Sequence, residues 1–208
     1  MHGHMTMLYK YPTYKDTYVG SGIMINHSHV LTAGHNLFSS KNGRIPDEVK
    51  FYPGRQGGYT PWCMTGKKFK VHRKYYDSEN YDYDISVLVL EEQIGHQTGW
   101  SRLAVFDDNR LLEGLSINIT GYPYHKFELD QPYMYTMNGS VMIAHQNRFY
   151  YDVDTSPGQS GSGVYVINTE SEIIDCLGIH TTGSRVEGNG ATRINKEKLN
   201  VIEKWVTS

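Results

Sequence analysis

The chain has 208 residues, a mass of 23.8 kDa and a formal net charge of −2, with 38% hydrophobic and 20% charged residues. This composition excludes a disordered acidic chain and a basic nucleic-acid tail, and a pI near 6.5 gives no electrostatic basis for binding nucleic acid or an anionic membrane. No apolar run approaches ~18 residues, so no spanning helix is predicted. The length suits one large domain or two small packed halves.

The first five residues, 1–5, have neither the charged region nor the apolar region of a signal peptide. Their composition, with His2 and His4, is typical of an added tag or of a processed start. We therefore place the beginning of the folded chain near residue 6.

Short segments with strand periodicity recur between turn signals along most of the chain. The predicted strands are 18–25, 30–32, 85–90, 115–120, 133–145, 148–154, 163–167, 173–179 and 191–194. With 21 glycines and 17 tyrosines, this pattern indicates an all-β protein, built as two packed barrels or a sandwich.

Only the tail that follows Asn195 has helical periodicity. Leu199, Ile202 and Val206 fall on one face of a helix, with Asn195 as its cap. The segment 95–113 has no strand periodicity and is expected to connect two halves.

The two cysteines, Cys63 and Cys176, are too few for a disulfide framework. Each is expected to be a small buried residue, with a single bridge between them as the alternative.

Three segments carry the residue types that nucleophilic catalysis requires. A predicted strand ends in the sequence LTAGH, which places His35 after small residues, and Asp84 leads into the buried run 85–90. The glycine-rich turn PGQSGSG holds Ser160. The chain order His…Asp…Ser supplies a base, an orienting carboxylate and a nucleophile.

Each residue type has a chemical reason to be present. A serine hydroxyl is a poor nucleophile at neutral pH, and the imidazole of His35 can remove its proton and return it later. A buried carboxylate fixes the imidazole tautomer. Glycines at 158 and 161 allow a sharp turn in which the amides of Gly158 and Ser160 donate to an oxyanion. Loss of one such donor costs on the order of 10²–10³ in turnover.

Taken singly, each segment has an ordinary structural explanation. A lone histidine is usually a satisfied polar side chain, glycines around a serine usually form a turn, and an aspartate often begins a strand. The presence of all three in this order favours catalysis, although distance along the chain does not show that they meet.

The same segments resemble the bacterial glutamyl endopeptidases, which are chymotrypsin-fold serine proteases, and their exfoliative-toxin relatives. The resemblance runs over residues 19–206 and includes TAGH at 32–35, FYPGR at 51–55, ITGYP at 119–123, GQSGS at 158–162 and GIH at 178–180. In the family, the aspartate is followed first by a variable residue, then by a small residue and then by two apolar residues. The sequence ISVL at 85–88 has this pattern after Asp84, so Asp84 fits better than Asp82.

The resemblance implies one serine protease domain over residues 1–208 that hydrolyses peptide bonds. It implies two packed six-stranded antiparallel β-barrels, at about 6–95 and 114–194, a C-terminal helix at 195–207, and an active site at the seam between the barrels.

The resemblance also implies cleavage after glutamate. The pocket histidine of the family matches His180, and a threonine five residues before the nucleophile matches Thr155. A carboxylate that enters a mostly neutral pocket needs a matching donor, because its desolvation is costly. In the family the N-terminal amine lies near this pocket, but residues 1–5 do not resemble such a start. The alternative is that His180 is a structural strand residue and Thr155 an ordinary turn residue.

Pro157 stands where the endopeptidases usually have glycine, whereas exfoliative toxins have Pro-Gly here and the Gly-Ser-Gly found at 161–163. In that branch the peptide bond can be flipped, which aims a carbonyl into the oxyanion hole. We hypothesise that the Pro157–Gly158 peptide is flipped in a partly latent resting enzyme, and that substrate restores the donor.

Other functions stay open at this point. The chain could be a protease of the same fold with a different primary specificity, or a catalytically latent binding protein, although binding does not require all of His35, Asp84 and Ser160. Metal chemistry is less favoured, because none of the ten histidines forms a His-Glu-x-x-His motif; structural calcium stays open. We expect no metal or cofactor in catalysis, protein or peptide substrates, a monomer, and secretion on the basis of the resemblance alone.

Overall fold

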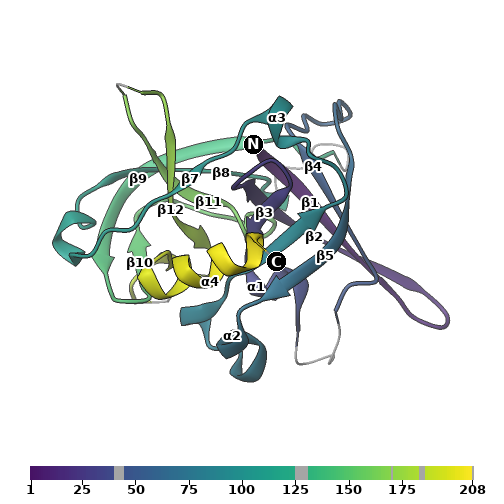
Figure 1. Cartoon of the computed structure of the whole chain (residues 1–208), viewed down its shortest axis with the longest axis horizontal. Coiled ribbons are helices and arrows are strands. Elements are labelled where there is room, and N and C mark those ends of the chain that lie inside the picture. The colour runs from purple at the N-terminus through teal and green to yellow at the C-terminus, as the bar shows by residue number, and fades with distance from the viewer. Residues whose placement is uncertain (40–44, 125–130, 170, 183–185, 208) are drawn as a thin grey trace.

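Six antiparallel strands in the first half of the chain close into a barrel in the order β1-β2-β3-β6-β5-β4 (Figure 1). The computed structural model describes residues 1–39, 45–124, 131–169, 171–182 and 186–207. The strands of this first barrel are β1 (His2–Lys10), β2 (Lys15–Met24), β3 (His29–Thr32), β4 (Glu48–Pro53), β5 (Met64–Val71) and β6 (Ser86–Leu90). Their inward-facing side chains, among them Met5, Phe51 and Leu88, form one buried apolar cluster.

A second antiparallel barrel follows, and the predicted pair of six-stranded barrels is confirmed. Its strands are β8 (Ser116–Gly121), β9 (Tyr135–Ala144), β10 (Arg148–Tyr151), β11 (Gly163–Ile167), β12 (Ile174–His180) and β13 (Asn189–Arg193). Strand β11 pairs with both β8 and β12, which closes the ring. A short seventh strand, β7 (Arg102–Leu103), adds to β12 in parallel.

Another apolar cluster joins the two barrels to the C-terminal helix α4 (Lys196–Val206). It combines Ile23 and Val87 of the first barrel with Ile179 of the second and Ile202 of α4. The helix has the predicted cap, because the Asn195 side chain accepts a hydrogen bond from the Lys198 amide. This packing explains why α4 lies along the barrels (Figure 1).

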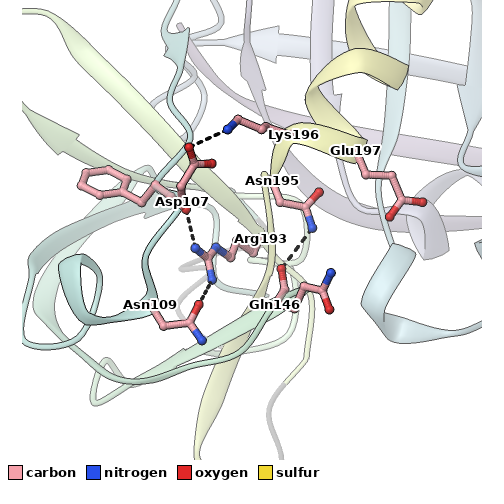
Figure 2. Close-up of a pocket in the computed structure, with 8 residues that line it drawn as sticks. Asp107, Asn109, Gln146, Arg193, Asn195, Lys196 and Glu197 are labelled. Carbon is pink, nitrogen blue, oxygen red and sulfur yellow. Dashed lines mark hydrogen bonds and ion pairs between the residues drawn. The ribbon is translucent and has the colours of Figure 1, made fainter.

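Polar contacts around a cavity of about 240 Å³ join the end of β13, just before α4, to the segment between the barrels. There Arg193 lies close to Asp107 and Asn109 (Figure 2). The buried Arg193 guanidinium donates to Asn109 Oδ1 and to the carbonyls of Phe106 and His145. These contacts tie β13 to the segment between the barrels.

Several elements were not predicted from periodicity. Strands β1, β4 and β5 were missed: β1 includes the residues whose composition is typical of a tag, and the alternation of half-buried and buried residues in β4 was overlooked. Four short helices were missed because one or two turns show no helical period. They are α1 (Gly34–Leu37), α2 (Arg73–Ser78), α3 (Gly95–Thr98) and the 3₁₀ helix η3 (Asn109–Leu111); a further 3₁₀ turn, η2, spans Tyr81–Tyr83. In the described part of the chain, no helix is long and apolar enough to cross a membrane.

The expectation that the fold begins near residue 6 is wrong. His2 and His4 lie in β1, which pairs with both β2 and β4, and both side chains are buried. The ring of His2 contacts Tyr165 of the second barrel, with ring centres 5.1 Å apart, and the ring of His4 contacts Tyr122 at 5.4 Å. The two histidines therefore belong to the junction between the barrels.

The two cysteines are both free, so no bridge forms between them. Cys176 is buried as predicted, and burial raises the pKa of its thiol to about 12. Cys63 is exposed, which contradicts the expectation for that residue.

Burial of His2 and His4 predicts a loss of stability in acid. Desolvation lowers the pKa of each ring from 6.5 to about 3. As the pH falls from 6.5 to 3, the unfolded chain therefore binds protons that the folded chain does not, and the free energy of unfolding falls. We expect this fall to be shallower in the double variant His2→Gln/His4→Gln, measured by urea unfolding at several pH values.

The matched control is His96→Gln, which changes an exposed histidine. An unchanged pH dependence in the double variant would contradict the assignment of an acid-sensitive junction to these two rings.

Candidate active site

The register of two paired strands brings His35 and Asp84 together. Strand β3 pairs with β6 so that Thr32 lies opposite Ser86. Asp84 precedes Ser86 by two residues and His35 follows Thr32 by three, so both residues leave the sheet at the same end. His35 lies in α1, and Asp84 ends the 3₁₀ turn η2.

Asp84 is fully buried, and both of its carboxylate oxygens bind His35. Oδ1 accepts the His35 backbone amide at 2.9 Å, and Oδ2 lies 2.7 Å from His35 Nδ1. A Cβ atom at Gly34 would lie 2.9 Å from Asp84 Oδ1, so the small residue before the histidine is required for this approach. Asp82, the weaker candidate, is instead in contact with Asn147.

The carboxylate of Asp84 changes the acidity of the His35 ring. Burial is the largest single effect and lowers the pKa of His35, but the charge of Asp84 and the hydrogen bond to it together raise that pKa above its ordinary value. The Nδ1–carboxylate contact leaves Nε2 as the nitrogen available to accept a proton.

Ser160 lies in a turn between β10 and β11, and the end of β12 binds the two residues that follow Ser160. The amide of Gly161 donates to the His180 carbonyl at 2.7 Å, and the amide of His180 donates to the Ser162 carbonyl at 2.8 Å. Gly158 and Gly161 have φ of +93° and +91°, the left-handed region that favours glycine.

The first barrel binds the same turn directly. The Ser160 carbonyl accepts the Ser21 amide at 2.8 Å and the Asn36 side-chain amide at 2.9 Å. The Ser21 hydroxyl donates to the Gly158 carbonyl at 2.9 Å and accepts the Tyr122 amide at 3.0 Å. Because Asn36 follows His35 in α1, these bonds place Ser160 beside the histidine.

Ser160 and His35 line one cavity of about 370 Å³. In the described residues the Ser160 hydroxyl donates to the Thr181 carbonyl at 3.4 Å, and it makes no hydrogen bond to the His35 ring. A bond from serine to the base therefore requires rotation of the serine side chain. Such bonds are often long or absent before substrate binds.

The flipped peptide that we hypothesised is not present. The Pro157 carbonyl accepts the Tyr124 amide at 2.6 Å and so points away from the Ser160 amide. The peptide is trans, so the Gly158 N–H points to the opposite side from Tyr124. Within the described residues neither this N–H nor that of Ser160 has an acceptor, which leaves two donors available for an oxyanion.

His180 is buried at the end of β12, and its Nδ1 lies 2.6 Å from the hydroxyl of Tyr151. Burial, and after it the charge of His35, lower the pKa of His180 to about 4. Burial raises the pKa of Tyr151 well above its ordinary value, so its hydroxyl keeps its proton. The histidine is therefore neutral at pH 7, with one N–H to donate.

Within the described residues, no hydrogen bond links Thr155 or the chain start to His180. Thr155 is half-buried in the turn before Ser160, and its side chain makes no hydrogen bond to the part of the chain that the structure describes. The Met1 nitrogen donates to the Thr98 carbonyl at 2.8 Å.

Three residues of the site escaped the sequence analysis. They are Ser21 and Asn36, which hold the Ser160 turn, and Tyr151, which binds His180. The position of Asn36 directly after His35 was a weak signal. Ser21 and Tyr151 carried none, because their partners are far away along the chain.

The comparisons with known proteins agree with this geometry. Residues 2–206, nearly the whole chain, match the family described as Trypsin. The chain belongs to the trypsin family. Membership establishes a serine-protease fold, and the glutamyl endopeptidases among its relatives are consistent with the resemblance seen in the sequence.

Similar proteins in this family include the "Extracellular metalloprotease" of Bacillus subtilis (strain 168), 29% identical over 197 residues that cover 94% of this chain and 61% of that protein. The "Glutamyl endopeptidase" of Bacillus licheniformis is 29% identical over 90% of this chain and 60% of its own length. That of Staphylococcus aureus (strain MW2) is 28% identical over 90% and 54%. This trypsin-family chain therefore spans less than two thirds of each of these relatives.

Two solved structures share the fold. A Glu endopeptidase in complex with MPD has a TM-score of 0.83 at 22% identity, covering 99% of this chain and 90% of that one. The protease Anisep from Arthrobacter nicotinovorans has a TM-score of 0.79 at 18% identity, covering 100% and 95%.

The name of the B. subtilis relative refers to a metal. In the described ranges of this trypsin-family chain, no three His, Cys, Asp or Glu side chains lie close enough together to hold an ion. The residues present there therefore do not fit a metal site of that kind.

Removal of the Asp84 charge tests the electrostatics of the site. In Asp84→Asn the His35 ring stays partly buried but loses the carboxylate, so we expect the pKa of His35 to fall below its ordinary value. The change is measured by NMR titration of the ring protons. The control Asp82→Asn removes a carboxylate two residues away that does not bind His35. A His35 pKa that is equal in both variants would contradict the assignment.

Proposed function

We propose that this chain is a serine endopeptidase in which His35, Asp84 and Ser160 form a catalytic triad. The observation that carries the proposal is the buried 2.7 Å contact between His35 Nδ1 and Asp84 Oδ2, beside a cavity that also contains Ser160. The family supports a peptidase. The amides of Gly158 and Ser160, which have no acceptor in the described part of the chain, would supply the donors that an acyl-transfer site needs.

In the proposed reaction, Ser160 Oγ attacks the carbonyl carbon of the scissile peptide bond while His35 Nε2 takes the hydroxyl proton. The negative oxygen that results accepts the amides of Gly158 and Ser160. His35 then gives the proton to the leaving amine, the C–N bond breaks, and an acyl-enzyme forms on Ser160. Water, deprotonated by His35, hydrolyses this ester and restores the serine.

We further propose that cleavage follows glutamate. The His180 ring also has a hydrogen bond to the Gly190 backbone, which acts to raise its pKa. We infer the tautomer in which Nδ1 accepts the Tyr151 hydroxyl and Nε2 carries the proton, so that the Nε2–H can donate to a substrate carboxylate. Arg148 supplies positive charge nearby. Its buried guanidinium donates to the carbonyls of Tyr81 and Thr182, which are neutral partners. Its charge adds to the effect of burial in lowering the pKa of His180, and it partly offsets the rise that burial causes in the pKa of Tyr151.

The alternatives from the sequence are less well supported. A catalytically latent binding protein has no need for the two free amides or for the buried His35–Asp84 pair. A different primary specificity in the same fold is tested directly below. Because one relative is named as extracellular, we propose that the chain acts outside the cell. We also propose that it acts as a monomer on protein or peptide substrates.

The triad is tested with a fluorophosphonate probe, which reacts with an activated serine. We expect the unaltered protein to be labelled and to cleave casein, and Ser160→Ala to lose both properties. Activity should fall by at least about 10³-fold, because no nucleophile remains. Ser162→Ala, two residues further along, is the control for the labelled position. Labelling that persists in Ser160→Ala would rule out the proposed nucleophile.

Specificity is tested with paired peptides that have Glu or Gln before the scissile bond. We expect His180→Leu to reduce the Glu-over-Gln ratio of kcat/KM by roughly 10- to 100-fold, because a hydrogen bond to a charged group is worth about 1.5–3 kcal/mol. The control His145→Leu changes an exposed histidine of the same barrel. Circular dichroism verifies that each variant folds. Equal turnover of the two peptides by the unaltered protein would exclude glutamate preference.

A further inference from the structure

The cavity that contains His35 and Ser160 continues onto the first barrel, away from β12. Its other lining residues include Met7 and Tyr9 of β1 and Tyr18 of β2. Met7 pairs directly with Tyr18 across the two strands, so the two side chains share one face of the sheet. The ring of Tyr9 meets that of Tyr18 edge-on, with centres 5.6 Å apart.

This part of the cavity has an apolar floor and an aromatic rim. Met7 and Tyr9 are 2% and 5% exposed, whereas Tyr18 is 51% exposed. The Tyr18 hydroxyl is hydrogen-bonded to the Asp16 carboxylate, which raises its pKa. The polar end of the side chain is thus already satisfied, and its ring is available for contact. The nearby Asp16 charge disfavours an acidic ligand.

The direction in which a peptide binds follows from which barrel lies on each side of Ser160. This step rests on the proposed function, in which the residue before the scissile bond lies against His180 of the second barrel. The residues after the bond then lie on the other side of Ser160. On that side, Ser21 and Asn36 of the first barrel bind the Ser160 carbonyl, and the cavity opens towards Tyr18.

We propose that Met7, Tyr9 and Tyr18 form a subsite for a large apolar or aromatic side chain on the leaving-group side of the cleaved bond. The hairpin formed by β1 and β2, in purple, extends well beyond the body of the first barrel (Figure 1) and supplies all three residues. Burial of an apolar side chain against this surface gains free energy in proportion to the area covered.

The test uses fluorogenic peptides that are identical up to the scissile bond and differ only in the residue after it, which is Phe, Leu, Ser or Asp. For the unaltered protein we expect kcat/KM to be about tenfold higher with Phe or Leu than with Ser. Tyr18→Ala should reduce this ratio to within about twofold of unity. Tyr18→Phe, which keeps the ring, should retain the preference.

Tyr14→Ala is the matched control. Tyr14 lies on the same hairpin, is 58% exposed, and stacks on Tyr11 at 4.4 Å instead of lining the cavity. The preference should survive this change. Cleavage without preference, or a preference that Tyr18→Ala leaves intact, would overturn the subsite and leave the protease assignment standing. Cleavage of none of the peptides would overturn both.

Discussion

The hydrogen bonds on the Ser160 carbonyl are the contact on which the rest of the site depends. Each barrel alone carries only part of the chemistry, because His35 and Asp84 belong to the first and Ser160 to the second. Ser21 and Asn36 reach across the seam to that carbonyl at 2.8 and 2.9 Å. Buried bonds of this kind are costly to break, since a buried donor or acceptor without a partner is strongly unfavourable. They fix Ser160 relative to His35 to within a side-chain rotation.

Glycine makes this close approach possible. A Cβ atom at Gly161 would lie 2.1 Å from the Ser21 carbonyl oxygen, and one at Gly121 would lie 2.9 Å from Ser21 Oγ. The glycine-rich sequences therefore serve the fit between the barrels as well as the turn itself. At Gly158 the same freedom lets the Pro157 carbonyl turn towards the Tyr124 amide, and the Gly158 N–H then has no acceptor among the residues that the structure describes.

Two histidines near the seam have opposite electrostatic environments. Asp84 raises the pKa of His35, which suits a group that takes and returns a proton. Burial and the charge of His35 lower that of His180, which keeps it neutral and suited to donating a single hydrogen bond. Groups of one chemical type whose pKa values are driven apart by their surroundings can take different roles in one reaction.

The sequence by itself determined the all-β class, the capped helix after Asn195 and the order of histidine, aspartate and serine. Local periodicity and short motifs are enough to indicate these features. Only the tertiary structure decided that His2 and His4 belong to β1, that Ser21 holds the Ser160 turn, and that the Pro157 carbonyl faces Tyr124. Each of these depends on a partner that lies far away in the chain. Pairing between strands and contacts across the seam bring such partners together, and no local pattern of residues encodes them.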